Sequence, residues 1–294
     1  MYEKVTNCPV CKTASFQNFI ICKDHTVSDE SFALTKCDNC GFVFTNPRPD
    51  ANVIDRYYQS ENYISHSNQT RSITDGMYKL VRLFTLRSKL KILNDLGTQK
   101  TLLDYGCGTG DFLEHCQSNG WTVNGVEPSE KARNISLNKI PAGIVADISQ
   151  FSKQDSFDII TLWHVLEHVH YLDSLIKSLK EKLNKNGYII IALPNRQSYD
   201  QSIYQEYWAA YDVPRHLYHF DQHTFSKLSM AHDLKLVNTL PMPFDSYYVS
   251  LLSEKYKYGK QNFIKSFLNG WKSNRWAKKN NNNYSSLIYI LKKK

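Results

Sequence analysis

Residues 100–193 alternate short apolar runs with longer stretches in which apolar residues recur at helical spacing. The apolar runs predict strands at Thr101–Tyr105, Thr122–Glu127, Gly143–Ala146, Phe157–Trp163 and Tyr188–Leu193. The stretches between them predict helices near Asp111–Asn119, Ser129–Asn138 and Leu172–Leu183. This alternation predicts an α/β fold, in which a mostly parallel sheet carries helices on both faces. Ligands of such sheets bind beyond the carboxyl ends of the strands.

The end of the chain predicts one more strand, at Tyr284–Leu291, with a helical segment before it. In that segment, residues 244–282, Tyr, Phe and Trp are interleaved with lysines. We therefore expect a helical insertion that covers a substrate site or forms a dimer contact. Basic and aromatic residues in this mixture are also compatible with RNA binding.

The composition is that of an ordinary globular protein, with 41% hydrophobic and 22% charged residues. The longest apolar runs are far too short to span a membrane, and the first residues do not form a secretory signal. These observations predict a cytoplasmic protein. The net charge of +8 is uneven, because residues 255–294 hold eleven Lys or Arg and no Asp or Glu. The basic segment is either a solvated surface or a patch for an anionic partner.

Four of the seven cysteines form two CxxC pairs, Cys8 with Cys11 and Cys37 with Cys40. Two such turns supply the four thiolates that structural zinc prefers, and they leave no position open for substrate. We therefore predict a zinc-ribbon-like module at residues 1–46, too small to fold on its own core. A linker and helical cap should follow at 47–98, and the main domain at 99–294.

The first predicted strand of the main domain ends in Asp104, and the glycines Gly106, Gly108 and Gly110 follow it in a GxGxG pattern. Dinucleotide sites have the spacing GxGxxG and place a helix N-terminus against a pyrophosphate. Here the third glycine comes one residue early. An acid two residues before the first glycine would repel a pyrophosphate but suits a cationic ligand. The pattern therefore favours a sulfonium amino-acid cofactor.

With these features the chain resembles the class I (Rossmann-like) S-adenosylmethionine-dependent methyltransferases over about residues 70–245. The segment Leu102–Leu113 is similar to their first motif. The resemblance implies a seven-stranded sheet, a ribose-binding carboxylate at Glu127 and an adenine contact at Asp147. It also implies that Phe157–Val169 borders the transferable methyl group. The cofactor-binding residues implied in this way are Asp104, Gly106, Cys107, Gly108, Gly110, Glu127, Pro128, Asp147, Ile148, Trp163 and His164.

Two narrower resemblances point to different substrates. The cysteine pairs together with the core are similar to bacterial small-molecule methyltransferases, including sugar C-methyltransferases. The element Leu166-Glu-His-Val169 is similar to the quinone-biosynthesis O-methyltransferases. Both imply a small acceptor, methylated on oxygen or carbon.

Methyl transfer to a hydroxyl or an acidic C–H group needs a base, and histidine is the usual one near neutral pH. The candidates are His164, Glu167, His168, His216 and His219. The first three form an HxxEH pattern that also occurs in zinc proteases on a continuous helix. Here the segment begins as a strand, so we expect a base or a divalent ion at the turn instead. The alternative is that these histidines only pack their loops. Arg215 would pair with an anionic acceptor.

Three functions remain open from the sequence. The first is methylation of a small sugar-like or quinone-like metabolite. The second is methylation of RNA or protein that is bound by the zinc module and the basic segment. Salt-dependent RNA binding that is lost on truncation after Lys255 would indicate this function. The third is a scaffold that binds the cofactor without catalysis. Neither the acceptor nor the oligomeric state follows from the sequence.

Overall fold

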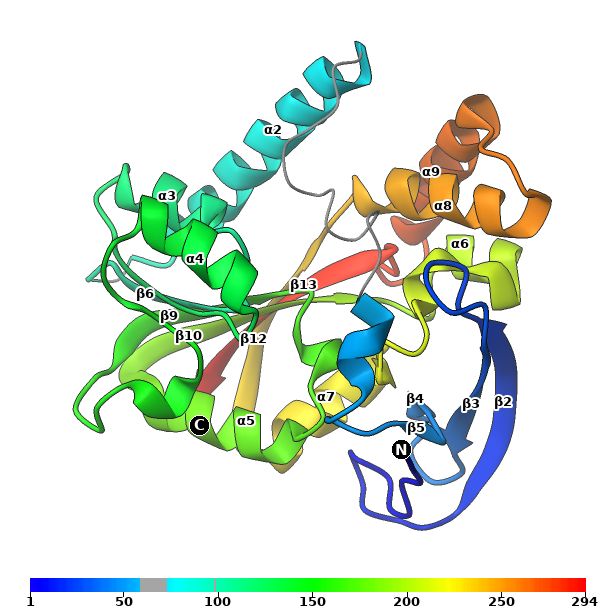
Figure 1. The fold of residues 1–294 in the computed structure, drawn as a ribbon, viewed down its shortest axis with the longest axis horizontal. Coiled ribbons are helices and arrows are strands. Elements are labelled where there is room, and N and C mark those ends of the chain that lie inside the picture. Colours follow the sequence, from blue (N-terminus) through cyan, green and yellow to red (C-terminus); the bar gives the residue numbers. More distant parts are fainter. Residues whose placement is uncertain (59–72, 98) are drawn as a thin grey trace. The chain divides into compact units, whose positions relative to one another are not determined.

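The computed structural model describes residues 1–58, 73–97 and 99–294 (Figure 1). Part of the predicted cap at 47–98 lies outside the described residues, at 59–72 and 98. The chain forms two compact units that interleave along the sequence. The first unit comprises Met1–Ile64, His164–Asp173 and Ile191–Ile290, and the second comprises Ser65–Trp163, Ser174–Ile190 and Leu291–Lys294. The domain boundaries at residues 46 and 98 stay a prediction.

A seven-stranded sheet in the order β12-β13-β10-β9-β6-β7-β8 confirms the predicted α/β fold. Its strands are β6 (Thr101–Tyr105), β7 (Thr122–Val126), β8 (Ile144–Val145), β9 (Phe157–Trp163), β10 (Leu183–Pro194), β12 (Leu234–Pro241) and β13 (Ser286–Lys293). Strand β6 pairs in parallel with β7 and β9, and β7 pairs in parallel with β8. The last strand of the chain, β13, is an inner strand between β12 and β10.

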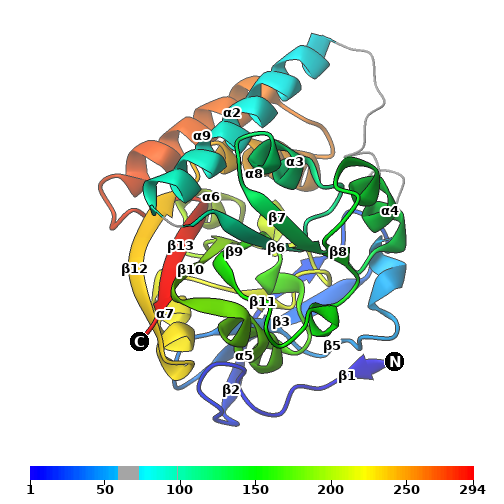
Figure 2. The same ribbon diagram turned by 90° about the vertical axis from the view of Figure 1, so that its left-hand side faces the viewer.

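The second unit supplies β6–β9 and the helices around them. These are α2 (Ile73–Asp95), α3 (Asp111–Gln117), α4 (Glu130–Lys139) and α5 (Leu172–Lys182), with the short turn η2 (Ile148–Gln150). Helices α3 and α4 lie on one face of the strands and α5 on the other (Figure 2). Leu102 and Leu103 of β6, and Ile159 and Ile160 of β9, are fully buried. Adjacent residues of a strand point to opposite faces of the sheet, so the burial of both shows that these strands are covered on both sides. Continuous apolar runs are typical of such strands.

The first unit contains a four-stranded sheet in the order β11-β4-β3-β2. Its strands are β2 (Phe16–Lys23), β3 (Ser31–Cys37), β4 (Val43–Thr45) and β11 (Tyr218–His219), and a second small sheet pairs β1 (Tyr2–Glu3) with β5 (Arg48–Pro49). Strand β11 pairs antiparallel with β4, with Tyr218 opposite Phe44. One sheet therefore joins the N-terminal segment to a loop far along the chain.

The core of the first unit runs from this sheet into the loop before β11. Phe32, Leu34 and Val43 of the sheet share one buried cluster with Trp208 and Tyr211. That loop forms the short turns η4 (Gln205–Tyr207) and η5 (Ala209–Tyr211) after α6 (Tyr199–Tyr204). The N-terminal sheet is therefore packed into this unit's core.

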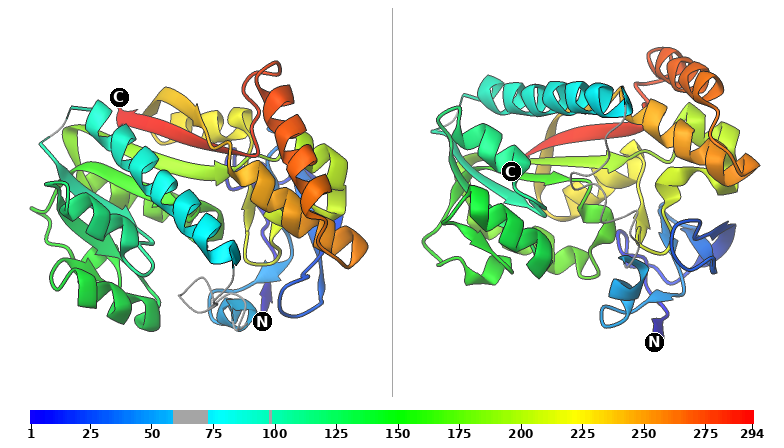
Figure 3. Two further views of the ribbon diagram at one scale, coloured as in Figure 1. Left: turned by 90° about the horizontal axis from the view of Figure 1, so that it is seen from above. Right: turned by 45° about the horizontal axis from the view of Figure 1, so that its top comes forward.

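The predicted helical insertion is confirmed as α8 (Asp245–Tyr258) and α9 (Phe263–Ala277), between β12 and β13. The two helices lie side by side (Figure 3). They approach closely at Gly270, where a Cβ atom would lie 2.6 Å from the ring of Tyr247. The remaining elements are η1 (Ile54–Tyr58), η3 (Leu166–His168) and α7 (Gln222–Ala231). No helix in the described part of the chain is long and apolar enough to cross a membrane.

Candidate cofactor site, histidine cluster and metal centre

The glycine loop after β6 has the backbone that its composition predicts. Gly106, Gly108 and Gly110 have φ angles of 77°, 57° and 77°, in the left-handed region that favours glycine. At Gly110 a Cβ atom would lie 2.5 Å from Ser136 Oγ on α4, so no side chain fits there. The loop leads directly into α3 at Asp111. Its backbone can therefore approach a ligand closely at the carboxyl end of the sheet.

Glu127 lies beside this loop because β6 and β7 are parallel neighbours and it directly follows β7. Its Oε2 accepts a hydrogen bond from the Gly108 N–H at 2.8 Å, and its Oε1 accepts one from the Ser129 N–H at 2.9 Å. Each oxygen keeps a second lone pair. The carboxylate is thus held in place by the backbone while it can still accept bonds from a diol.

Four more of the predicted cofactor residues lie in the second unit, in the segments that follow β6, β7 and β8. Asp147 caps η2, and its Oδ1 accepts a bond from the Ser149 N–H at 2.9 Å. Ile148 is buried beside it, and the exposed Pro128 follows Glu127. Cys107 is buried, which raises the pKa of its thiol to about 12 and leaves it unreactive.

Asp104 is buried at the end of β6, and its Oδ1 accepts a hydrogen bond from the Thr161 hydroxyl at 2.6 Å. Burial raises the pKa of this carboxyl to about 7, although the bond from Thr161 opposes the shift. Trp163 packs edge-on against Phe112, with the Lys89 ammonium 4.3 Å from its ring centroid. Its buried Nε1 has no hydrogen-bond partner among the residues that the structure describes. An unpaired donor here fits the prediction that Trp163 borders a ligand.

His164 directly follows β9, which confirms that the HxxEH segment is not one continuous helix. Its φ of 57° is rare for a residue other than glycine. Its Nδ1 lies 3.5 Å from Glu167 Oε1, and its Nε2 lies 3.2 Å from Asp245 Oδ2. Burial would lower the pKa of His164, but the two carboxylates outweigh burial and raise it to about 10. His164 is therefore protonated near neutral pH and unsuited to take up a proton.

Glu167, His168 and His216 come together in the first unit. One potential ligand atom from each lies within 4.8 Å of the others. Burial would raise the pKa of Glu167, but the contact with His164 and the nearby His216 and His168 lower it. Burial, reinforced by His216, lowers the pKa of His168 to about 4. The cluster therefore contains a carboxylate beside a neutral imidazole.

His219 does not join this cluster. It lies in β11, where its Nε2 is 3.1 Å from the Thr45 hydroxyl and its ring packs edge-on against Tyr211. Burial lowers the pKa of His219 well below its ordinary value. These contacts link β11 to β4 and indicate that the role of His219 is packing.

The prediction for Arg215 is wrong. Its side chain is 1% exposed, and its guanidinium binds Asp24 at 2.9 Å and Asp212 at 2.7 Å. A further donor reaches the Tyr57 carbonyl at 2.9 Å. Arg215 therefore holds the N-terminal segment to the loop before β11, and its burial keeps it away from an anionic acceptor.

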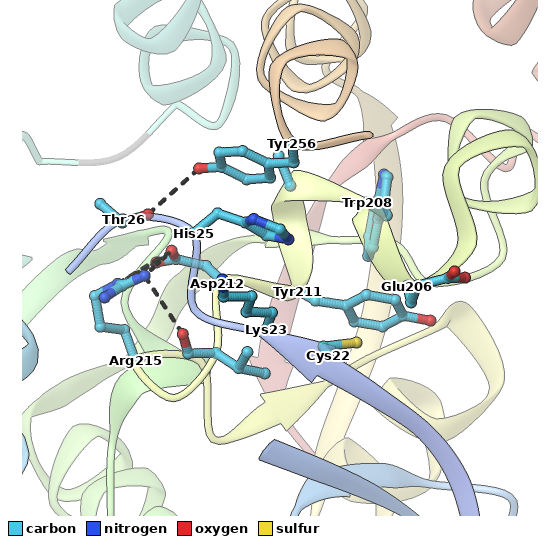
Figure 4. A pocket seen from close by; sticks show the side chains of 12 residues that line it. Cys22, Lys23, His25, Thr26, Glu206, Trp208, Tyr211, Asp212, Arg215 and Tyr256 are labelled. Carbon is cyan, nitrogen blue, oxygen red and sulfur yellow. Dashed lines mark hydrogen bonds and ion pairs between the residues drawn. The ribbon is translucent and has the colours of Figure 1, made fainter. Parts of the chain in front are cut away.

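Arg215 lines a small cavity in the first unit, drawn in Figure 4 together with Tyr256, whose ring stacks on His25 at a centroid distance of 4.6 Å. The Thr26 and Tyr256 hydroxyls lie 3.3 Å apart at its edge. The cavity measures about 10 Å³, room for a single water molecule and not for a sugar or a quinone. The cavity is a small gap in the packing beside the buried ion pairs of Arg215.

The four predicted zinc ligands come together as expected. Cys8 Sγ lies 3.6 Å from Cys40 Sγ, and Cys11 Sγ lies 3.5 Å from Cys37 Sγ. All four sulfur atoms lie within 4.8 Å of one another. Zinc–sulfur bonds of about 2.3 Å in a tetrahedron separate the sulfurs by about 3.8 Å, so the residues fit a zinc ion. Gly41, with a φ of 75°, forms the tight turn after Cys40.

Two residues of the site have no signal in the sequence. Asp245, which contacts His164, is the first residue of α8 and lies far from it in the chain. Tyr58, at the end of η1, lies 3.0 Å from His168 Nδ1 through its hydroxyl. Both contacts join residues that lie far apart in the sequence, so the spacing of residues along the chain does not predict them.

A family model described as a methyltransferase domain matches residues 78–239, more than half of the chain. The ubiquinone biosynthesis O-methyltransferase of Pelagibacter ubique is 32% identical over 125 residues, which are 40% of this chain and 50% of the relative. A methyltransferase of Bacillus cytotoxicus, named as uncharacterized, is 28% identical over 123 residues, 38% of this chain and 58% of the relative. The chain spans about half the length of the curated relatives that it matches.

Among solved structures, magnesium protoporphyrin IX methyltransferase from Synechocystis with bound SAH superposes with a TM-score of 0.54. The match covers 83% of this chain and all of the other, at 14% sequence identity. At this identity the likeness shows the fold alone. It confirms the Rossmann-like architecture that the alternating pattern predicts.

Proposed function

Because the chain belongs to the family defined by this methyltransferase domain, we propose that it transfers a methyl group from S-adenosylmethionine to an oxygen or carbon atom of a small metabolite. The names of the relatives favour a small acceptor, and we take a sugar-like or quinone-like one as the class. The observation that carries the proposal is the carboxylate of Glu127, which the backbone holds beside a left-handed glycine loop.

The cofactor supplies a methyl group on a sulfonium centre, which is already activated for displacement. The residues of the chain then bind the cofactor and orient its methyl group toward the acceptor. Glu127 would accept bonds from the two ribose hydroxyls, since each of its oxygens keeps a free lone pair. Asp147 would accept one from the adenine amino group. In its ionised form Asp104 supplies negative charge under the loop, where a cationic amino acid is favoured.

The acceptor must lose a proton as its oxygen or carbon bonds to the methyl group, while the electron pair of the broken C–S bond stays on sulfur. His164 is held protonated between two carboxylates, and His219 is bonded to Thr45. We therefore assign removal of the proton to the cluster of Glu167, His168 and His216. Alignment of the reacting atoms supplies most of the remaining rate enhancement.

The four cysteines would bind a structural zinc ion. Their thiolates fill every position of a tetrahedral ion, so the ion has no place for a substrate. Its role would be to fold the N-terminal sheet, in which Cys37 ends β3.

Calorimetric titration of S-adenosylmethionine into the full chain tests the proposal. Substitution Glu127→Ala should weaken binding by about 100-fold or more, because it removes two hydrogen bonds to a charged group, each of which contributes about 1.5–3 kcal/mol. Glu130→Ala, an exposed acid on the adjacent helix, is the matched control and should bind as the wild type does. A wild-type chain that binds no cofactor would refute the proposed function.

A further inference from the structure

The cluster of Glu167, His168 and His216 has an unusual balance of hydrogen-bonding groups. Both carboxylate oxygens of Glu167 are buried and have no hydrogen-bond partner among the described residues. The nearest cation, His164, stays 3.5 Å away and also contacts Asp245. One imidazolium therefore serves two carboxylates, which leaves the buried charge of Glu167 only partly compensated, at a cost in free energy.

The two histidines do not supply donors to this carboxylate. His216 Nδ1 lies 2.9 Å from the Ala210 carbonyl, and His168 Nδ1 lies 3.1 Å from the Arg215 carbonyl. A carbonyl oxygen can only accept, so in a neutral ring Nδ1 carries the proton and Nε2 carries a lone pair. The Tyr58 hydroxyl, 3.0 Å from His168 Nδ1, can share the same proton as a second acceptor.

Neither Nε2 has a hydrogen bond within the part of the chain that the structure describes. His216 Nε2 faces another carboxylate instead, Asp212 Oδ2, at 3.9 Å. One ring nitrogen of each histidine and one carboxylate oxygen of Glu167 lie within 4.8 Å of one another, with the two rings 4.5 Å apart at their centroids. A cation bound by these three side chains would compensate the buried negative charge of Glu167.

We propose that Glu167, His168 and His216 bind a divalent transition-metal cation. Two imidazoles and one carboxylate suit zinc, iron, cobalt or manganese, and they leave positions open for water or substrate oxygen. Metal-binding histidines typically donate their other ring N–H to a backbone carbonyl, as both do here. Bonds of about 2.0–2.2 Å bring ligand atoms to about 3–4 Å from one another, a small closure from the observed spacing.

This site differs in chemistry from the four-cysteine centre. Thiolates select zinc, whereas an imidazole and carboxylate site also accepts cobalt and manganese. Metal binding follows from the geometry of the cluster, and only its use in the reaction rests on the proposed methyl transfer. An acceptor hydroxyl bound to the cation would lose its proton more easily, as metal-bound water does. The hydroxyl proton would then pass to a solvent water molecule, and the cation would hold the resulting oxygen anion for attack on the methyl group.

Reconstitution of the full chain with Co²⁺ tests the site. The chain is treated with chelator, loaded with one equivalent of Zn²⁺ for the cysteines, and titrated with Co²⁺, with both metals counted by mass spectrometry. We expect one Co²⁺ per wild-type chain in addition to the zinc, with an absorption spectrum free of thiolate charge-transfer bands. His216→Ala and Glu167→Gln should each weaken Co²⁺ binding at least ~10-fold, since the loss of even a group that only hydrogen-bonds to a metal ligand costs this much.

His223→Ala removes an exposed histidine on α7 and should leave the Co²⁺ affinity unchanged. Glu167→Gln keeps the shape of the side chain, and one zinc ion retained per variant chain shows that the first unit is folded. The proposal is overturned if the wild-type chain takes up no Co²⁺ beyond the cysteine site, or if both variants bind it as tightly as the wild type. S-adenosylmethionine affinity, measured on the same samples, reports separately on the proposed function.

Discussion

Asp104 is a carboxyl group that the fold keeps out of water. It lies under the glycine loop and accepts a hydrogen bond from the Thr161 hydroxyl on the neighbouring strand. Burial raises the pKa of this carboxyl to about 7, while the unfolded chain loses the proton near its ordinary value of 3.8. The folded state therefore holds one more proton than the unfolded state between these two values. Stability must fall as the pH rises through this window.

Asp104→Asn removes that proton linkage. Relative to the wild type, the variant should gain a few kcal/mol in free energy of unfolding as the pH rises from about 4 to about 7. The reason is that a difference of one bound proton changes this free energy by about 1.4 kcal/mol per pH unit. Denaturant unfolding of both proteins at several pH values measures the gain.

Asp95→Asn, at an exposed acid of the same unit, is the control for this prediction and should show no such trend. A constant difference between Asp104→Asn and wild type across this pH range would contradict the raised pKa of Asp104.

The residues of the glycine loop are predictable because their signals are local. Three glycines in one turn need positive φ angles, and an acid after the adjacent strand follows from the βαβ order. The histidine cluster is only partly predictable. His216 meets Glu167 through a loop that follows α6, and the sequence offers no spacing rule for that contact. The prediction for Arg215 fails for the same reason, because its ion-pair partner Asp24 lies far away in the sequence.

At the scale of elements, strand β13 places the basic C-terminal segment inside the fold. The segment holds both α9 and an inner strand of the sheet, so it is not a detachable tail. Truncation after Lys255 would remove that strand and unfold the sheet. RNA binding must instead be tested with substitutions at exposed positions.

The matched variant is Lys272→Ala, Lys278→Ala and Lys279→Ala together, all at exposed positions in or just after α9. With a small metabolite as acceptor, we expect wild type and variant to bind single-stranded RNA equally weakly and S-adenosylmethionine equally well. Filter binding at several salt concentrations measures this. If the RNA methyltransferase hypothesis held, the slope of log K against log salt would fall by about two on losing three charges.

Strand boundaries are predicted well where an apolar run is buried on both faces. Strand β9 spans the predicted Phe157–Trp163, because its residues are buried by helices on both sides. Strand β10 begins at Leu183, ahead of the predicted start at Tyr188. The residues between these two positions, Asn-Lys-Asn-Gly, include no β-branched or aromatic side chain, so they carry no strand signal. The antiparallel pairing of β2 with β3 is likewise absent from the prediction, because the two CxxC pairs indicate a metal site without indicating the strands between them.

At the scale of the whole molecule, the N-terminal module and the loop before β11 share one core. Phe32 and Leu34 pack in the same cluster as Trp208 and Tyr211, and Asp24 pairs with Arg215. Loss of the proposed zinc ion should therefore affect residues far beyond the first 46. Structural zinc contributes about 10–16 kcal/mol to folding in small modules, as much as the stability of an entire domain.

Chelation, or Cys37→Ser, should raise hydrogen exchange in residues 1–58 and also in residues 199–220. Mass spectrometry of peptic peptides measures the exchange, and re-addition of Zn²⁺ to the chelated wild type should reverse it. Strands β6 and β7, in the second unit, serve as the internal reference. Faster exchange confined to residues 1–46 would show that the module folds apart from the loop.

The pairing of β11 with β4 also has a consequence for the growing polypeptide. The ribosome releases β2, β3 and β4 early, but their fourth strand exists only after His219 has been added. At about 5–20 residues per second, the free edge of β4 waits roughly 10–35 s for its partner. During that interval both CxxC pairs have already been synthesised, so zinc binding to them can precede closure of the sheet. Zinc supply to the nascent chain would then decide how many molecules reach the finished fold.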